Sequence, residues 1–352
     1  MRFHKDSGAS LFAMEEELTK LTRLGDPLVL LAKRIDFEFF RPLLEKGLYR
    51  DGDRSRGGRP PFDPVMMFKI LVLQRYYNLS DDAVESAILD RLTFKRFLGL
   101  DMGNRIPDAK TIWLFRDQLQ KQNLIKQLFD QMNAELERQN IIANAGQIVD
   151  ASFVEAPRQR NRKEDNDTIK EGGVPEEWKE NPHKLCQKDT DARWAKKNQE
   201  TYFGYKNHVI CDRGSKLVKD FVVTSAEVHD SQVLSDLICG GAAEGQTLYA
   251  DSAYRSAEIE DELGERGIRS RVHYKGARNR PLTAAQQASN TARSRKRARV
   301  EHVFGYMTNS MGGMVVRACS KARNEAVIGL MNLAYNLRRV VQLNRELRAS
   351  TA

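Results

Sequence analysis

Residues 146–156 read GQIVDASFVEA, and here strand-like composition replaces the helical periodicity of the preceding chain. β-branched and aromatic residues flanked by glycine and small polar residues are typical of a strand. Four similar runs follow: ETYFGYKNHVICD (200–212), KLVKDFVVTSA (216–226), QTLYADSAY (246–254) and SRVHYKG (270–276). Because helical patterns intervene at 231–239 and 256–267, the second half of the chain is predicted to be an α/β domain.

The first part of the chain is predicted to be all-α. DPVMMFKILVLQRYY (63–77) opens with Asp63 as a helix N-cap and Pro64 at the first helical position, and SDDAVESAILDRL (80–92) opens with Ser80. Short helices joined by tight turns favour a helix-turn-helix-like reader of DNA. A plain helical bundle is the alternative that this pattern leaves open.

A further predicted helix, PDAKTIWLFRDQL (107–119), starts at Asp108. Its apolar residues fall on one face, and the other face offers Lys110, Thr111 and Arg116. A basic, polar helix face suits a groove of DNA, so these three residues are predicted DNA contacts.

We divide the chain into four regions. They are an N-terminal helical segment with a basic arm (1–60), a helical DNA-binding region (61–140), the α/β domain (141–320) and a C-terminal helix (321–352). Within the α/β domain, residues 158–200 are polar and charged. We interpret them as an insertion that is either mobile or ordered by a partner.

The 352 residues carry a formal net charge of +9 and have a pI near 9.3, with arginine gathered between Arg293 and Arg323. This charge indicates a polyanionic partner, nucleic acid ahead of anionic membrane, although ribosomal and regulatory proteins share the trait. The cysteines lack a C-x-x-C pair, which argues against a zinc site or a disulfide framework. They are Cys186, Cys211, Cys239 and Cys319.

No apolar run of the sequence reaches membrane-spanning length. The first residues, MRFHKDSGASLFAMEEEL, also lack the basic-then-apolar layout of a signal peptide. Together with the cysteine pattern, this predicts a soluble protein of the reducing cytoplasm with no membrane partner.

Three acidic residues stand out as candidates for chemistry. Asp150 and Asp251 each lie where a predicted strand ends, and Glu301 lies on a predicted helix. Each has a simpler interpretation, because such an aspartate is often a turn or helix cap and Glu301 can pair with Arg297 one turn earlier. Taken together, however, three converging carboxylates repel one another unless divalent cations neutralise them.

All-oxygen ligands select Mg²⁺ or Mn²⁺. Two such ions roughly 3.5–4 Å apart can hold the attacking and leaving oxygens of a phosphodiester displacement. The sequence therefore predicts a site for divalent metal, with two ions, on a protein whose basic surface brings phosphates to the acids.

Several ordered motifs resemble those of bacterial insertion-sequence transposases of the insertion sequence five group, over nearly the whole chain. The motifs in the first half are GRPPFDPVMMFKILVLQ (58–74), LSDDAVESAILDRLTFKRFLGL (79–100) and PDAKTIWLFRDQL (107–119). Those in the second half are VDASFVEAP (149–157), DARWAKKNQETYFGYKNHVICD (191–212), AEVHDSQVL (226–234), YADSAY (249–254) and RARVEHVFG (297–305).

The resemblance implies a ribonuclease-H-like catalytic domain in which Asp150, Asp251 and Glu301 are the catalytic metal ligands. It also supports Arg297 as the basic residue four positions before the glutamate. In the related insertion sequence four group, that arginine belongs to a Tyr-Arg-Glu-Lys signature. Ser294 and Thr308 occupy the tyrosine and lysine places here, so roles of those two side chains do not transfer.

Five further residues are candidates for roles near the acids or on the DNA. Arg293 and Arg297 lie one helical turn apart and are predicted to hold phosphates. Lys206 is predicted either to contact phosphate or to be a plain exposed lysine. Asp230 is predicted to cap the following helix, with a catalytic part as the alternative, and His302 is predicted not to bind metal.

The resemblance implies a transposase that binds the terminal inverted repeats of its element. It would cleave DNA with metal-activated water and join the exposed 3′-hydroxyl to target DNA. A homodimer is expected, because two DNA ends must be brought together. The alternatives are a sequence-specific DNA-binding regulator with a non-catalytic triad, and a metal-dependent nuclease that does not join strands.

Overall fold

The computed structural model describes residues 12–48, 60–197, 199–241, 244–278 and 280–350, the last seven of these for the backbone only. The chain forms two compact units. The first contains the described residues up to Gln74 together with Leu79–Arg116, and the second contains Arg75–Asn78 and the chain from Asp117 onward.

The N-terminal unit is helical, as predicted. Its elements are α1 (Ala13–Arg23), α2 (Pro27–Arg34), η1 (Phe37–Phe40), α3 (Arg41–Leu48), α4 (Pro64–Tyr77), α5 (Asp81–Asp90), α6 (Leu92–Leu98) and the first part of α7 (Ala109–Lys121). The predicted N-caps are confirmed, because the Asp63, Ser80 and Asp108 side chains accept hydrogen bonds from Val65, Ala83 and Thr111 backbone N–H groups.

The boundary between the units lies earlier than predicted. Helix α8 (Leu124–Arg138) was assigned to the DNA-binding region, but it belongs to the second unit. Phe129 packs edge-on against Phe221 with ring centroids 5.0 Å apart, and Asn133 donates to the Val218 and Lys219 carbonyls. These contacts bury α8 on the sheet, so the boundary falls near residue 116 instead of residue 140.

The second unit is built on a six-stranded mixed sheet of order β2-β3-β1-β5-β6, with β4 also paired to β3. Its strands are β1 (Gln147–Glu155), β2 (Arg193–Lys197), β3 (Glu200–Asp212), β4 (Val218–Ser225), β5 (Thr247–Tyr249) and β6 (Arg269–Ser270). β1, β3 and β4 are antiparallel, whereas β1, β5 and β6 are parallel. Four of the five predicted strands are therefore confirmed, although β5 is short. The fifth, predicted at 270–276, is wrong beyond its first residue, because β6 ends at Ser270 and residues 271–276 have no regular secondary structure.

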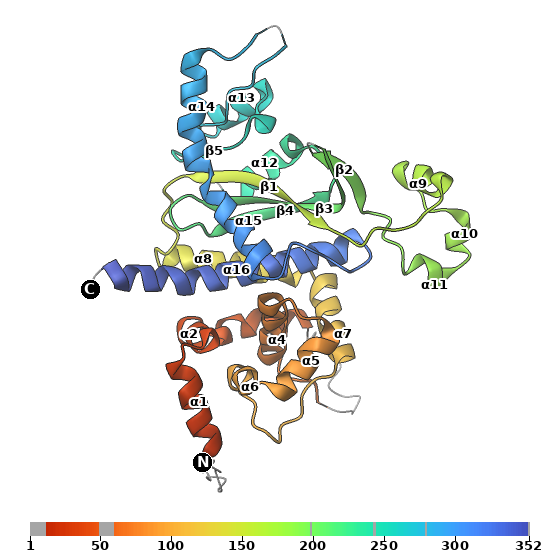
Figure 1. Ribbon diagram of the computed structural model, residues 1–352, viewed down its shortest axis with the longest axis vertical. Coiled ribbons are helices and arrows are strands. Elements are labelled where there is room, and N and C mark those ends of the chain that lie inside the picture. The colour runs from red at the N-terminus through yellow and green to blue at the C-terminus, as the bar shows by residue number, and fades with distance from the viewer. Residues whose placement is uncertain (1–11, 49–59, 198, 242–243, 279, 351–352) are drawn as a thin grey trace, which may run out of the picture. The chain divides into compact units, whose positions relative to one another are not determined.

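Helices cover both faces of this sheet (Figure 1). η3 (Asp230–Val233), α12 (Leu234–Gly241) and α13 (Ala257–Glu265) share a buried apolar cluster with Val149, Ile210 and Leu248 of the strands. α8 and α16 (Lys321–Ser350) lie along the other face. The predicted C-terminal helix is thus part of the second unit's core and not a separate region.

Buried asparagines join α16 to the sheet. Asn332 exchanges amide hydrogen bonds with Asn207 of β3, and both side chains are fully buried. Asn336 accepts from the Val218 N–H at 2.9 Å and donates to the Val218 carbonyl at 2.7 Å. Because buried polar groups are costly when unpaired, these bonds fix the position of α16 along the sheet.

Residues 158–197, 199 and 200 are folded, so the prediction of a segment that is mobile or ordered by a partner is wrong for the part that the structure describes. They contain α9 (Lys163–Lys170), α10 (Glu176–Lys179), α11 (Pro182–Leu185) and strand β2. The Trp178 side chain is fully buried. Asp189 accepts hydrogen bonds from the Tyr205 hydroxyl and the Asn324 amide, which tie this segment to β3 and α16.

Two further findings concern the whole described chain. Each of the four cysteines is a free thiol. In the part of the chain that the structure describes, no helix has the length and apolar character needed to span a bilayer.

Candidate active site

Asp150 and Asp251 are brought together by the register of two parallel strands. β1 pairs with β5 so that Gln147 lies opposite Leu248 and Ile148 lies opposite Tyr249. The same offset places Asp150 level with Asp251, just beyond the end of β5. Asp251 also caps η4 (Ser252–Tyr254) by accepting from the Ala253 N–H at 2.6 Å, so its simpler interpretation as a cap is correct as well.

The Asp150 carboxylate is largely removed from water, with a side chain that is 20% exposed. Burial raises its pKa above the ordinary value, and the charge of Asp251 adds to this effect, while Arg297 and Lys197 oppose it. One carboxylate oxygen accepts from the Ala151 N–H at 3.0 Å. Asp150 is therefore a largely buried acid whose negative charge is favoured by Arg297 and Lys197.

Arg297 provides the closest of these cations. Its Nη1 lies 2.5 Å from Oδ2 of Asp150. The simpler interpretation, in which Arg297 pairs with Glu301, is wrong, because the guanidinium is bonded to Asp150, 147 positions away in the sequence. The reason is a helix break: α14 (Ala284–Arg297) ends at Arg297, and α15 (Arg299–Ser310) begins after Ala298.

Glu301 lies in the first turn of α15, where a negative charge suits the helix dipole. Helix α15 buries Val300, Val303 and Met307, whereas Glu301 is exposed and forms no ion pair with a described residue. Among the described residues, no three His, Cys, Asp or Glu side chains are close enough together to hold a metal ion. The structure thus brings together two of the three predicted acids and leaves Glu301 apart, one turn beyond Arg297.

Arg293 does not occupy the predicted phosphate-binding position. Its side chain is buried, donates to the Val272 carbonyl and lies over the Tyr274 ring, with Cζ 4.3 Å from the centroid. Arg255 lies over the same ring at 4.6 Å. Arg293 therefore stabilises the attachment of α14 to the sheet domain, and burial prevents it from reaching DNA in this conformation.

Lys206 is paired within the protein. Its Nζ lies 2.8 Å from Asp230 and donates to the Val228 carbonyl at 2.7 Å, so it is not the exposed lysine that was the alternative. The side chain that caps η3 is His229, whereas Asp230 is held by Lys206. Buried His208 lies 4.0 Å from Asp230, and burial lowers its pKa to about 4, so it is neutral at pH 7. Exposed His302 stands in no metal-binding group of described residues.

The three predicted DNA contacts on α7 differ in their surroundings. Lys110 is exposed and Thr111 is half-buried. Arg116 forms a two-pronged ion pair with Asp81 at 2.7 and 2.8 Å and also donates to Gln74. Its guanidinium is thus committed to contacts inside the N-terminal unit, which contradicts its predicted role as a reader of DNA.

These surroundings predict different effects for two matched substitutions. Lys110→Ala should weaken binding to all DNA and reduce the slope of log affinity against log salt by about one unit. Arg116→Ala should instead lower the free energy of unfolding by about 1–3 kcal/mol, because Asp81 loses its charged partner. Salt titrations of DNA binding and urea unfolding separate the two effects. A stable Arg116→Ala protein with an altered salt slope would restore Arg116 as a DNA contact.

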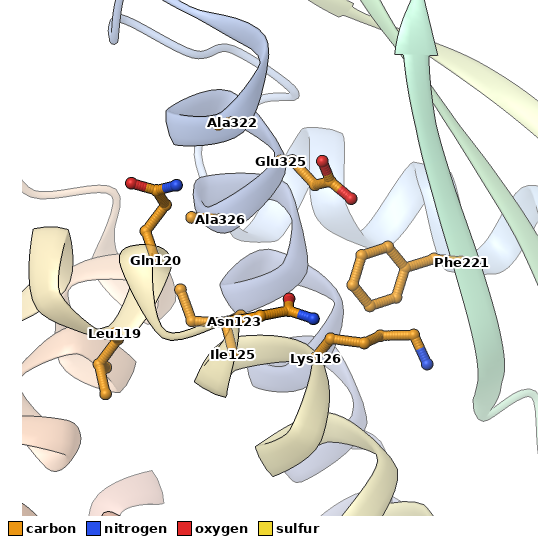
Figure 2. Close-up of a pocket in the computed structure, with 9 residues that line it drawn as sticks. All are labelled: Leu119, Gln120, Asn123, Ile125, Lys126, Phe221, Ala322, Glu325 and Ala326. Carbon is orange, nitrogen blue, oxygen red and sulfur yellow. The ribbon is translucent and has the colours of Figure 1, made fainter. Parts of the chain in front are cut away.

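Two hollows of the second unit have different relations to the acids. A pocket of about 190 Å³ is lined by residues of α7, α8, β4 and α16, among them Lys126, Phe221 and Glu325 (Figure 2). None of the predicted site residues lines this pocket. A larger hollow of about 390 Å³ borders β1 directly after Asp150. Exposed Trp194 and Lys197 are among its lining residues.

A comparison of the sequence with known families decides what these acids belong to. Residues 144–337, more than half of the chain, match the family described as Transposase DDE domain. The chain belongs to the DDE transposase family. In this transposase, residues 16–118 match a second family, described as Transposase domain (DUF772). The protein is therefore a DNA transposase, an enzyme that cleaves DNA and transfers DNA strands.

Two solved structures are similar to this transposase. A piggyBac transposase synaptic complex with hairpin DNA, determined by cryo-electron microscopy, is 12% identical with a TM-score of 0.44; the match covers 94% of this chain and 77% of that chain. A crystal structure of a pre-cleavage Mos1 transpososome is 9% identical with a TM-score of 0.27, and the match covers 98% of both chains.

DDE transposases use divalent metal ions, and the donors of this chain fit such an ion. Asp150 and Asp251 provide oxygen ligands side by side. The Tyr254 hydroxyl is buried and has no hydrogen-bond partner among the described residues. Its pKa is raised first by this burial and then by the charges of Asp230, Asp150 and Asp251. A hydrated cation would give this hydroxyl an acceptor. Tyr254 was missed from the sequence, and its position three residues after Asp251 was the available signal.

Proposed function

We propose that Asp150, Asp251 and Glu301 form the catalytic centre of this transposase. The observation that carries the proposal is the strand register that sets Asp150 level with Asp251, beside the helix that bears Glu301. A ribonuclease-H-like assignment is supported by the antiparallel β1, β3 and β4, which continue into the parallel β5 and β6. The motif resemblance supports an assignment of the chain to the insertion sequence five group.

Asp150, Asp251 and Glu301 would hold two divalent ions, Mg²⁺ or Mn²⁺, which when bound activate water and hydroxyl and neutralise charge on the phosphodiester. The chain itself prepares the site for this charge. Burial of Asp150 limits competing water, and a cation beside it opposes the rise that burial causes in its pKa. No covalent link between protein and DNA is required, so no tyrosine or serine nucleophile is part of the proposal.

The DNA strand at the catalytic centre would be held by basic and aromatic side chains of the second unit. Lys196, Lys197 and Trp194 are exposed around the hollow that follows Asp150 on β1. Lysines attract the phosphates, and an exposed aromatic ring is a surface on which a base can stack. Arg297 would contact a phosphate beside the acids.

The N-terminal unit would read the terminal inverted repeats of the element. Its α5, α6 and α7 support a helix-turn-helix-like assignment, with Lys110 and Thr111 as the remaining candidates for DNA contact. Because two ends must be processed together, we propose a homodimer on paired ends and, for the last step, target DNA. The cytoplasm is the proposed location.

A joining assay tests this function. The full-length protein is incubated with Mg²⁺ or Mn²⁺, labelled duplexes of the element's own ends and a supercoiled target plasmid. We expect the label to enter the plasmid through a new covalent bond at the 3′ end. Nicked ends without joined product would identify a nuclease, and end binding without nicking in either metal would identify a DNA-binding regulator.

A further inference from the structure

Arg297 holds Asp150 through an incomplete set of bonds. Only Nη1 of the guanidinium contacts the carboxylate, at 2.5 Å, whereas arginine binds carboxylate and phosphate most strongly through two parallel hydrogen bonds. The Arg297 Nε is buried and has no hydrogen-bond partner among the described residues. A buried donor without a partner is costly, so this side chain has a donor available for a second anion.

The position of Arg297 is linked to that of Glu301 by a single-residue junction. Arg297 is the last residue of α14, and Glu301 lies in the first turn of α15. The Ala298 N–H donates to the Ser294 carbonyl, and the Ala298 carbonyl accepts from the Glu301 N–H at 3.2 Å. Arg297 and Glu301 are therefore connected through Ala298 and its two backbone hydrogen bonds.

Arg297 and a divalent ion would compete for the same oxygen of Asp150. Oδ1 of Asp150 already accepts a hydrogen bond from the Ala151 N–H. A divalent ion bound to Oδ2 would therefore meet Arg297, which contacts the same oxygen. Two cations on one oxygen repel each other. The Asp251 carboxylate lies alongside that of Asp150, so a cation at this point is attracted by both negative charges.

We infer that Arg297 is a positioning residue that exchanges between Asp150 and a DNA phosphate when a divalent ion binds. Before the ion binds, Arg297 neutralises Asp150 and holds the junction so that Glu301 stays apart. When the ion binds Oδ2 of Asp150, the Arg297 guanidinium leaves this oxygen and donates hydrogen bonds from Nε and Nη to a phosphate. The exchange couples ion binding to DNA binding, and it rests on the proposed function of the three acids.

Manganese binding to the full-length protein without DNA tests the exchange. Free Mn²⁺ is measured by electron paramagnetic resonance in titrations of the wild type, Arg297→Gln and Arg299→Gln. Arg299 is an exposed neighbour that donates to the Arg213 carbonyl, so its substitution removes the same charge without freeing Asp150. Arg297→Gln should bind Mn²⁺ at least about fivefold more tightly than wild type, at the lower end of typical coupling between sites. Arg299→Gln should differ from wild type by less than about twofold, as expected of a screened surface charge.

Equal Mn²⁺ affinity of Arg297→Gln and Arg299→Gln would overturn the exchange and leave the proposed active site intact. Unchanged Mn²⁺ binding by Asp150→Asn would be a different failure, because it would remove the ion from Asp150 altogether. Hydrogen exchange of the wild-type protein gives a second readout that needs no variant. Addition of Mn²⁺ should change amide exchange in the peptide that spans residues 294–302, and an unchanged peptide at saturating Mn²⁺ would also overturn the inference.

Discussion

Asp150→Asn, Asp251→Asn and Glu301→Gln should each reduce the rate of DNA-end cleavage by at least about 10³-fold, within the range expected when one catalytic group is removed. Each substitution keeps the shape of the side chain but removes the negative charge that a divalent ion requires. Affinity for DNA ends should not fall by more than about threefold, because loss of an acid does not weaken phosphate binding. Cleavage is measured in Mn²⁺ on labelled ends.

The matched control for these variants is Asp236→Asn, an exposed acid of α12 in the same unit. This change removes one charge from the domain and should leave the cleavage rate within about twofold of wild type, as for a surface charge away from the chemistry. If one of the three site variants behaves like Asp236→Asn, that residue does not belong to the site. Asp230, whose charge acts on the Tyr254 hydroxyl, is then the next acid to substitute.

Asn336→Ala should lower the free energy of unfolding of the second unit by about 2–4 kcal/mol, the cost of more than one buried polar group left without a partner. The substitution removes the partner of the Val218 N–H, one donor to the Val218 carbonyl, and the donor to the Asn133 amide oxygen. All three lie in the buried contact between α16, α8 and β4. The cost is therefore much larger than for an exposed asparagine.

Urea unfolding measures this effect if the fluorescence reports on the second unit alone. Trp113 belongs to the N-terminal unit, whereas Trp178 and Trp194 belong to the second, so the measurement uses a Trp113→Phe background. Asn309→Ala, at an exposed position of α15, is the matched control and should change the free energy by less than about 0.5 kcal/mol. Equal effects of the two substitutions would show that the asparagine bonds do not hold α16 in place.

The parts of this fold that depend on local pattern could be predicted from the sequence. Asp63, Ser80 and Asp108 were identified as N-caps because a cap bonds to backbone only two or three residues away. Asp251 could be singled out because it follows a run of strand-forming residues. Asp150 was predicted at a strand end as well, but β1 continues through it to Glu155. The parallel pairing that sets them level could not be predicted, because β2, β3 and β4 separate β1 from β5 in the sequence.

Contacts between distant parts of the chain could not be predicted in this way. The helical periodicity around Arg297 placed it beside Glu301, but the partner it has is Asp150, and no local rule connects the two. Arg293 lies in an arginine-rich stretch and was predicted to be exposed. Its burial depends on a contact with Tyr274, which belongs to another segment. Trp178 is buried within a segment whose composition is polar, so the folding of residues 158–200 was missed.

The same limit explains the misplaced domain boundary. Helix α8 has an amphipathic pattern that fits either unit, and only its contacts with Phe221 and Val218 assign it to the second. The asparagines of α16 were not recognised for a related reason. Asn332 and Asn336 interrupt an apolar face. They stabilise the fold only through hydrogen bonds to partners more than a hundred positions away in the sequence.

Anomalous diffraction from crystals of the full-length protein with DNA ends and Mn²⁺ tests the central claim most directly. We expect manganese peaks bound by Asp150, Asp251 and Glu301, with Arg297 displaced from Asp150 onto a phosphate. Peaks bound by other residues, with Asp150 still paired to Arg297, would contradict it.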